Sequence, residues 1–225
     1  MPKSKVRVWD LPTRTFHWLL AVLVLLQFGT AEWDWLDMHW HMRFGYSVLA
    51  LVVFRIAWGF VGSDTSRFSN FVCGPVRAWR FFKASLTDHE QRTTGHNPLG
   101  AWSVLAMLAS LALQAVTGLF ASDDIITFGP LTSRVSDSTV ALMTRIHSWN
   151  RNVLLVLIAL HIIAVVVHLI GKRDNLIGPM LSGNKTFTGP VAVPRIRPWW
   201  WALPIIIVAG LLVWALVIWG EAGGS

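Results

Sequence analysis

The sequence predicts an all-α integral membrane protein with five transmembrane helices. Hydrophobic residues make up 54% of the 225 residues and charged residues only 14%, and several apolar runs are long enough to cross a hydrocarbon layer about 30 Å thick. Backbone N–H and C=O groups inside lipid need partners within the chain, so these runs should be helices rather than strands. A soluble globular protein is therefore not expected.

Five spans follow from the hydropathy of the chain, and charged or turn residues separate them. They cover about residues 14–33, 40–62, 99–121, 146–170 and 199–219. A basic segment precedes the first span, as in a signal peptide, but Glu32, Trp33 and Asp34 follow it where a small-residue cleavage site would stand. We therefore expect the first span to be retained. Asn97 and Pro98 are expected to cap and start the third.

Lysines and arginines are concentrated in the segments on one side of these spans. They are Lys3, Lys5, Arg7, Arg14, Arg67, Arg77, Arg80, Lys83, Arg92, Lys172, Arg173, Lys185, Arg195 and Arg197. The other side has fewer basic residues (Arg43, Arg134, Arg145 and Arg151) and more acidic ones (Glu32, Asp34, Asp37, Asp123, Asp124 and Asp137). The positive-inside rule predicts a cytoplasmic N-terminus and a periplasmic C-terminus in a bacterial inner membrane. The net charge of +7 then indicates loops that face anionic lipid, and no nucleic-acid partner is expected.

Two of the eight histidines, His147 and His161, share the fourth span. An α-helix rises 1.5 Å per residue, so their spacing separates them by about 21 Å along the helix axis. The rotation between them falls about 40° short of four full turns, so both imidazoles lie on nearly the same face. One helix thus offers a metal ligand near each membrane surface.

The predicted orientation supplies a partner histidine at each depth. His17 begins the first span on the cytoplasmic side, and His41 begins the second span on the periplasmic side. The depths therefore pair His41 with His147, and His17 with His161. Iron with two axial imidazoles has no open coordination position, which suits electron transfer. Two such b-type haems, stacked across the bilayer, would carry electrons through the membrane.

These histidines also allow two alternative roles, and the residues alone leave both open. Histidines in a membrane protein are often interfacial or packed polar residues. Imidazole also binds zinc and copper, although neither histidine pair has obvious third and fourth ligands among cysteine, aspartate and glutamate. Four histidines at matching depths on three spans favour the haem interpretation.

Three further residues are candidates for the inner, cytoplasmic end of the site. Arg55 lies within the second span, where it could bind a haem propionate or extend to the lipid headgroups. His96 precedes the third span and could donate a hydrogen bond to a quinone carbonyl or to a propionate, or be simply interfacial. His168 lies on a face similar to that of His161 and is its rival as the inner ligand.

Several sequence motifs, taken in order, resemble a known family. They are VWDLPTRTFHW at 8–18, His41 through Gly45-Tyr46, FRIAWGFVGSDTSRFSNFVCGP at 54–75, GHNPLG at 95–100, TG at 117–118 and IHSWNRNVLLVLIALHI at 146–162. Over roughly residues 6–186 the chain resembles the bacterial cytochrome b561-like proteins, which are related to the cytochrome b subunits of nickel–iron hydrogenases and formate dehydrogenases.

This resemblance implies a four-helix transmembrane bundle that holds two haems b through histidines of its first, second and fourth helices. Transferred to this chain, those ligands are His17, His41, His147 and His161, the same four that depth and spacing select. The fifth span lies outside the shared core. We therefore expect a di-haem domain over residues 1–186, followed over 187–225 by a linker and a C-terminal transmembrane helix.

No motif indicates self-contained substrate chemistry, since the chain lacks a nucleotide-binding fingerprint, a phosphate-binding loop and a nucleophile with an adjacent base. The sequence instead predicts a subunit that transfers electrons between the quinone pool and a periplasmic cytochrome c or dehydrogenase subunit. The sequence leaves open whether the protein forms a homo-oligomer. Transfer of electrons from superoxide to quinone is an alternative. A haem-free membrane scaffold or metal transporter is an alternative of another class.

Overall fold

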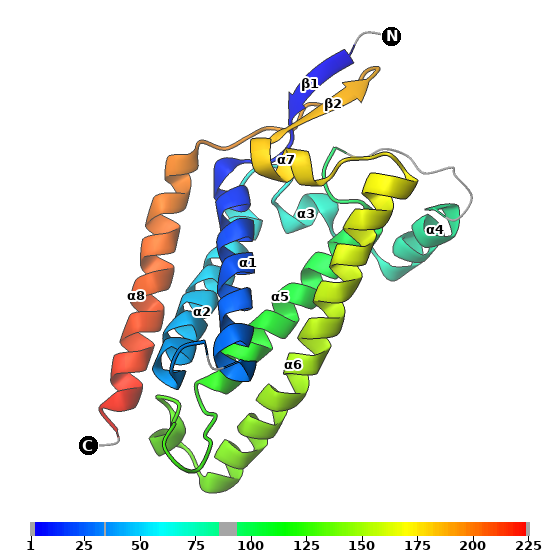
Figure 1. Cartoon of the computed structure of the whole chain (residues 1–225). Coiled ribbons are helices and arrows are strands. Elements are labelled where there is room, and N and C mark those ends of the chain that lie inside the picture. The colour runs from blue at the N-terminus through cyan, green and yellow to red at the C-terminus, as the bar shows by residue number, and fades with distance from the viewer. Residues whose placement is uncertain (1–2, 34, 86–93, 224–225) are drawn as a thin grey trace. The chain divides into compact units, whose positions relative to one another are not determined.

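The computed structural model describes residues 3–33, 35–85 and 94–223, so Asp34 and Arg92, used for the predicted orientation, lie outside the described residues. Within this part of the chain, five helices are long and apolar enough to cross a membrane. They are α1 (Leu11–Glu32), α2 (Met38–Val61), α5 (Pro98–Gly118), α6 (Asp137–Val166) and α8 (Ala202–Glu221), labelled in Figure 1. The prediction of an all-helical protein with five membrane spans is confirmed.

Shorter elements connect these helices. They are β1 (Lys3–Arg7), α3 (Phe68–Phe71), α4 (Pro75–Ser85), the 3-10 turn η1 (Thr132–Arg134), the π-helical turn η2 (Val167–Gly171), α7 (Ile177–Ser182), β2 (Asn184–Thr188) and the 3-10 turn η3 (Trp199–Trp201). Hydropathy does not predict them, because such short elements are stabilised by their contacts more than by their own sequence.

The fourth membrane helix is longer than its apolar stretch. It begins at Asp137, whereas hydropathy predicts the span from about residue 146. Residues 137–145 are too polar to count toward a span, yet they form helix readily, and Asp137 adds a favourable negative charge to its first turn. At its other end α6 continues into η2, which contains His168.

Asn97 caps the third membrane helix, as the sequence predicts. Its side-chain Oδ1 accepts a hydrogen bond of 2.7 Å from the backbone N–H of Gly100. Pro98 is the first helical residue, a position where the missing N–H of proline leaves no bond unmade.

The chain forms two compact units. Unit 1 comprises Met1–Thr15, Ile56–Ala106 and Leu157–Leu203, and unit 2 comprises Phe16–Arg55, Met107–Val156 and Pro204–Ser225. The long helices each contribute residues to both units.

Unit 1 contains a two-stranded antiparallel sheet in which Val6 of β1 pairs with Lys185 of β2. Figure 1 shows the two strands side by side, with α7 next to β2. Gly183 ends α7 in the left-handed conformation, with φ of 84°. Its carbonyl oxygen accepts the N–H groups of Val8 and Trp9, so this turn joins β2 to the segment before α1.

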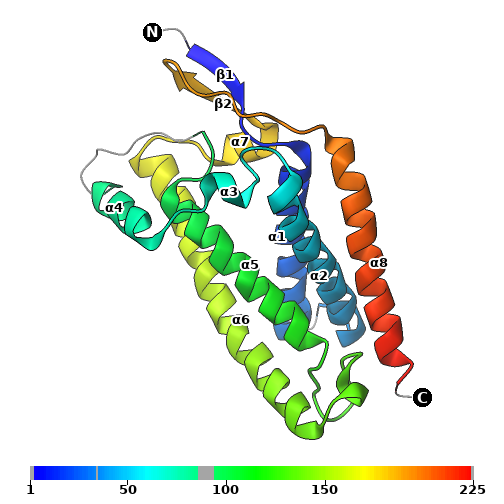
Figure 2. The ribbon, with the colours of Figure 1, turned by 180° about the vertical axis from the view of Figure 1, so that it is seen from behind.

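Unit 2 includes the fifth membrane helix as part of its core. Val213 and Val217 of α8 pack with Leu49 of α2 and with Leu119 and Leu131 of the α5–α6 connection. Figure 2 shows α8 running beside α2. The helix C-terminal to the predicted haem domain is thus packed against it.

The α5–α6 connection also binds the end of α8 through polar contacts. Nη2 of Arg134 donates a hydrogen bond of 2.5 Å to the carbonyl oxygen of Trp219, and the guanidinium lies 4.5 Å from the centroid of the Trp219 ring. A Cβ on Gly220 would lie 2.4 Å from the carbonyl oxygen of Pro130. Only glycine allows this close approach of the two backbones.

Candidate functional site

His41 and His147 lie together in unit 2. His41 is in the first turns of α2, and His147 is in α6. Their ring centroids are 6.4 Å apart, and the ring planes are inclined by 77°. The structure therefore brings together the two histidines that depth predicts as the outer pair.

A threonine of α1 orients the His41 ring. The Thr30 hydroxyl lies 3.0 Å from the carbonyl oxygens of both Leu26 and Gln27, one turn earlier in the same helix, so its single hydrogen is used within α1. The same hydroxyl oxygen lies 3.0 Å from Nδ1 of His41. While its hydrogen is donated within α1, the hydroxyl oxygen accepts from His41, an arrangement in which His41 carries its proton on Nδ1.

α5 orients His147 in the same way. Nδ1 of His147 lies 2.9 Å from the carbonyl oxygen of Gln114 and 3.3 Å from the hydroxyl oxygen of Thr117. Thr117 donates its own hydrogen to the carbonyl oxygen of Leu113 at 2.6 Å. Both atoms facing the ring are acceptors, so His147 also carries its proton on Nδ1, and Nε2 of each histidine keeps a free lone pair for a metal.

A glycine makes room for the His147 ring. A Cβ on Gly118 would lie 3.0 Å from Cε1 of His147 and 3.3 Å from its Nδ1. This is closer than side chains normally pack, so the ring would have to move for any larger residue. The Thr117-Gly118 pair, one of the family-like motifs, therefore shapes one side of the site.

Asn150 fixes α6 against α5 beside His147. It is buried, and its side-chain nitrogen donates to Oε1 of Gln114 at 2.7 Å and to the carbonyl oxygen of Ser110 at 2.9 Å. The hydroxyl of Ser110 donates back to Oδ1 of Asn150 at 3.0 Å. With its polar groups paired in this way, the amide makes a rigid connection, so the position of His147 is set by α5.

The outer pair fits a haem with two axial imidazoles. With metal–nitrogen bonds of roughly 2 Å, and roughly 1 Å from each nitrogen to its ring centroid, two imidazoles across one metal would have centroids about 6 Å apart. The observed 6.4 Å agrees with this spacing. Among the described residues no group of three or more His, Cys, Asp and Glu side chains could hold a metal ion.

The predicted inner ligands are distributed between the two units. His17 belongs to unit 2, where its ring contacts Trp18 edge-on with centroids 5.0 Å apart. His161 belongs to unit 1, as does its rival His168, whose Nδ1 lies 2.9 Å from the carbonyl oxygen of Ala164. The inner pair stays a prediction.

Arg55 and His96, the other two candidates, are both packed within the protein. The Arg55 side chain is only 3% exposed, so it does not extend along the surface to the lipid headgroups. The His96 ring lies between two aromatic rings of unit 1, with centroids 4.8 Å from Trp9 and 4.6 Å from Phe71. The cap formed by Asn97 accounts for the turn before α5. The aromatic contacts hold His96, the residue before Asn97.

Asp10 is the centre of a buried polar network that sequence reasoning missed. Its side chain is fully buried, and Oδ1 accepts the N–H of Thr13 at 2.7 Å, which caps α1. Its Oδ2 accepts from the Ser66 hydroxyl at 2.9 Å and from the Trp58 indole N–H at 3.2 Å. All four residues lie in the family-like motifs 8–18 and 54–75, so the presence of buried-type polar residues in these motifs was the available signal.

A second set of contacts in unit 1 holds the linker before α8 against the α2–α3 connection. Oδ2 of Asp64 accepts the backbone N–H of Arg195 at 2.8 Å, and the Ser63 hydroxyl accepts that of Arg197 at 2.9 Å. The Arg195 N–H, together with the Arg67 guanidinium, lowers the pKa of the Asp64 carboxyl below its ordinary value. The linker is thus bound by specific residues of the motif 54–75.

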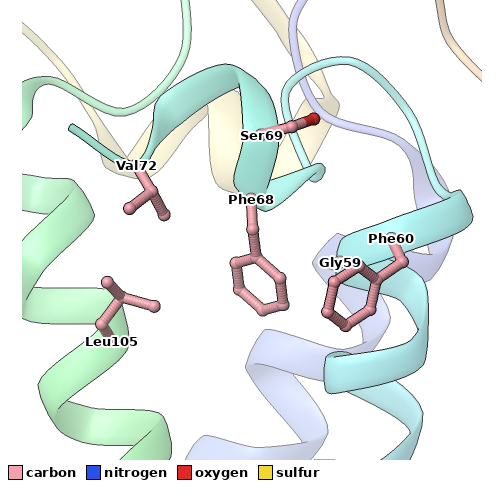
Figure 3. A pocket seen from close by; sticks show the side chains of 6 residues that line it. All are labelled: Gly59, Phe60, Phe68, Ser69, Val72 and Leu105. Carbon is pink, nitrogen blue, oxygen red and sulfur yellow. The ribbon is translucent and has the colours of Figure 1, made fainter.

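A hollow in unit 1 contains none of the predicted site residues. It has a volume of about 550 Å³ and is lined by Gly59, Phe60, Phe68, Ser69, Val72 and Leu105. Figure 3 shows the Phe68 ring pointing into it between Phe60 and Leu105. A Cβ on Gly59 would lie 2.1 Å from this ring, so glycine at 59 allows Phe68 to pack there.

Comparison with known proteins gives one family and several relatives. Residues 8–183 match the family model described as prokaryotic cytochrome b561. A probable Ni/Fe-hydrogenase B-type cytochrome subunit of Rhizobium leguminosarum bv. viciae is 25% identical over 223 residues, covering 82% of this chain and 90% of the relative.

Two further relatives carry the same name. The one from Cupriavidus necator is 23% identical over 211 residues, covering 80% of this chain and 86% of the relative. The one from Bradyrhizobium diazoefficiens is 26% identical over 218 residues, covering 82% and 87%. No solved structure matches the chain. The matched range 8–183 contains all four candidate ligands and ends before α8.

Proposed function

Because this chain belongs to the prokaryotic cytochrome b561 family, we propose that it is a two-haem cytochrome b that passes electrons between the quinone pool and a periplasmic redox partner. The family and the five apolar helices make it a multi-pass membrane protein, a b-type cytochrome of the hydrogenase type that acts in electron transport. The observation that carries the proposal is the facing pair His41 and His147.

The outer haem is assigned to His41 and His147. Their separation and their protonation on Nδ1, which Thr30 and Thr117 favour, support coordination through Nε2. A haem b bound between these imidazoles would supply one-electron transfer. Thr30, Gln114 and Thr117 would hold the two rings in place around it.

The inner haem is assigned to His17 and His161. The support is the depth of each residue along its helix and the charge asymmetry of the loops. His168, seven residues further along the same helix, is the alternative ligand. A second haem on α6 about 21 Å from the first would continue the electron path across the bilayer.

Arg55 and His96 are assigned to the inner end of this path. A buried guanidinium needs an anion, and a haem propionate would supply one to Arg55. His96, at the start of α5 and held between aromatic rings, is a candidate donor to a quinone carbonyl. We expect quinone to react near the cytoplasmic surface.

The redox partner is expected on the periplasmic side. The relatives are named as hydrogenase cytochrome subunits, which supports a dehydrogenase or hydrogenase subunit as the partner, with a soluble cytochrome c as the other candidate. The orientation that this requires, with a cytoplasmic N-terminus and a periplasmic C-terminus, rests on the positive-inside rule. Residues 1–186 would form the di-haem domain, and 187–225 the linker and fifth helix.

The test begins with the haem content of the purified protein in lipid nanodiscs. The pyridine haemochrome spectrum should give two haems b per chain, and the visible spectrum should be that of low-spin, six-coordinate haem. Absence of a Soret band, or a content of one haem per chain, would contradict the two-haem proposal.

Electron transfer is tested separately by anaerobic addition of ubiquinol and menaquinol analogues. Either quinol should reduce the haems, and an oxidised soluble c-type cytochrome should then reoxidise them. Haems that stay oxidised with every quinol would rule out quinol oxidation. Reduction by enzymatically generated superoxide but by no quinol would favour transfer from superoxide to quinone.

A further inference from the structure

The connection between α5 and α6 exposes two adjacent isoleucines at the end of unit 2 that carries His41 and His147. Ile125 and Ile126 are 80% and 84% exposed, the largest values among the large apolar side chains of the described residues. Adjacent exposed apolar side chains can mark a site of contact with a protein or with a membrane. Their surroundings indicate which kind of molecule covers them.

The loop that carries the isoleucines is rigidly built. Oδ1 of Asp123 accepts three backbone N–H groups, those of Ile125 at 3.0 Å, Ile126 at 2.9 Å and Thr127 at 2.7 Å. These N–H groups lower the pKa of the Asp123 carboxyl below its ordinary value. Since the turn is organised by an ionised carboxylate, the isoleucines are presented in one conformation, which suits recognition of a partner.

A hollow of about 350 Å³ adjoins the tip within unit 2. Ile126 and Phe128 line one side of it, and Met38, His39 and Met42 of α2 line the other. Asp37 and Thr127 complete the lining. An apolar projection beside a hollow with both apolar and polar walls gives a shaped surface that a second protein can match.

This surface is directly connected to the outer histidine pair. The loop follows Thr117 and Gly118, which contact His147. It is also bound to α6 by a hydrogen bond of 3.1 Å from the N–H of Ser122 to the hydroxyl of Thr144, a residue one turn before His147. A molecule seated on the tip would therefore lie close to the outer electron-transfer site.

The charges around the tip distinguish a protein partner from lipid. Asp123 and Asp124 precede the two isoleucines, and Asp37 lines the hollow. Segments that insert into membrane interfaces carry lysine and arginine, because lipid surfaces are anionic. An apolar centre with an acidic border is instead typical of a protein-docking surface, in which the charges steer the partner and the apolar residues hold it.

We propose that Ile125, Ile126 and the adjoining hollow form the docking surface for a soluble redox protein whose own face has an apolar socket bordered by lysine and arginine. The inference rests on the proposed function, because that function puts this end of the protein in the periplasm and requires an electron partner there. It adds the surface that is used and the chemistry of the partner that fits it.

The test uses the full-length protein in nanodiscs and a basic c-type cytochrome, with a lysine-rich haem edge, as the probe. Its binding is measured by surface plasmon resonance, and its reduction by the quinol-reduced protein is measured in a stopped-flow instrument. In the variant Ile125→Ser/Ile126→Ser, Kd and KM should rise about tenfold, the magnitude typical of interface hot spots. Haem content and the rate of haem reduction by quinol should equal those of the wild type.

A matched control removes an equally exposed aliphatic residue elsewhere. Val193, in the linker before α8, is 75% exposed, and Val193→Ser should leave Kd and KM unchanged. An equal effect of both variants, or no binding of the basic cytochrome to the wild type, would overturn the proposal. Because binding is measured directly, failure of quinol oxidation would count against the proposed function alone.

Two further measurements test the charge and the lipid alternative. The variant Asp37→Lys/Asp124→Lys should weaken binding of the basic cytochrome and strengthen that of an acidic c-type cytochrome, with both effects shrinking as salt rises. In Ile125→Trp, the new indole should stay accessible to aqueous iodide, and a difference spectrum against the wild type isolates its emission. Quenching of this emission by brominated lipid would show that the tip inserts into the membrane and would overturn the proposal.

Discussion

The imidazole rings of His41 and His147 lie with their centroids 6.4 Å apart, and each Nδ1 is within hydrogen-bond distance of an oxygen atom, the Thr30 hydroxyl for His41 and the Gln114 carbonyl for His147. Two helices that do not carry these histidines, α1 and α5, supply those oxygens. The site is therefore formed by four helices, and changes in any of them should alter the outer haem.

If the two-haem proposal is correct, removing one proposed ligand should remove one haem. His41→Ala and His147→Ala should each lower the haem content from two to one per chain, because a haem with one remaining imidazole is held weakly. His17→Ala and His161→Ala should remove the other haem, and the pyridine haemochrome assay together with the spectrum identifies which is lost. If His168→Ala removes the inner haem while His161→Ala does not, the inner ligand is His168.

The Thr30 hydroxyl should tune the outer haem through His41. Thr30→Val removes one of the two hydrogen-bond partners of the His41 ring, the other being the backbone of Gln27, which makes the imidazole a weaker donor to the ferric iron. Loss of one hydrogen bond, about 0.5–1.5 kcal/mol, corresponds to a rise of about 20–60 mV in the midpoint potential of the outer haem. Redox titration followed by absorbance measures it. Thr30→Ser should restore the wild-type potential, and a serine variant as shifted as the valine variant would contradict this role.

Gly118→Ala should disturb the outer site while an equivalent change in α8 should not. The new Cβ would lie 3.0 Å from Cε1 of His147, so the ring must shift. We expect changed g-values of the outer low-spin haem in electron paramagnetic resonance and faster loss of that haem on heating. Gly210→Ala is the control, since a Cβ there meets nothing within 4 Å. Identical spectra for the two variants would refute the close contact.

Asp10→Ala should destabilise the protein without removing a ligand. The change deletes the cap of α1 and leaves the buried Trp58 and Ser66 donors without their acceptor, a combined loss of about 2–4 kcal/mol. The temperature at which the Soret band is lost should fall by several degrees. Asp137→Ala, an exposed position in the first turn of α6, should change this temperature much less.

The hydrogen bond from the backbone N–H of Arg195 in the linker to the Asp64 carboxylate in the α2–α3 connection should weaken in acid. The folded protein lowers the pKa of Asp64, so its contribution to stability is complete above the ordinary carboxyl pKa of about 4. It is lost as the pH falls below that value and through the lowered pKa, because the unfolded chain takes up the proton first. The loss of thermal stability between about pH 5 and 3 should be smaller in Asp64→Asn than in the wild type. If the melting temperatures of the two proteins fall in parallel as the pH is lowered, Asp64 does not make this contribution.

Local sequence was sufficient for the membrane helices but not for their ends. Hydropathy located all five helices, and the Asn97-Pro98 pair located the start of α5. It predicts the fourth span from about residue 146, whereas α6 begins at Asp137, because hydropathy detects only the apolar part of a helix and residues 137–145 are more polar. The strands β1 and β2 were also missed, since their pairing joins two short segments far apart in the chain, one just before and one just after the matched region.

The sequence by itself determined the membrane class, the family and the spacing of His147 and His161 on one helix, because these depend on composition, motif order and helical periodicity. Only the tertiary structure decided that Thr30 and Thr117 face the rings of His41 and His147 and that Asp10 joins α1 to the segment after α2. Each of these contacts connects helices far apart in the chain. Their formation depends on how side chains pack between helices, which no local pattern of residues specifies.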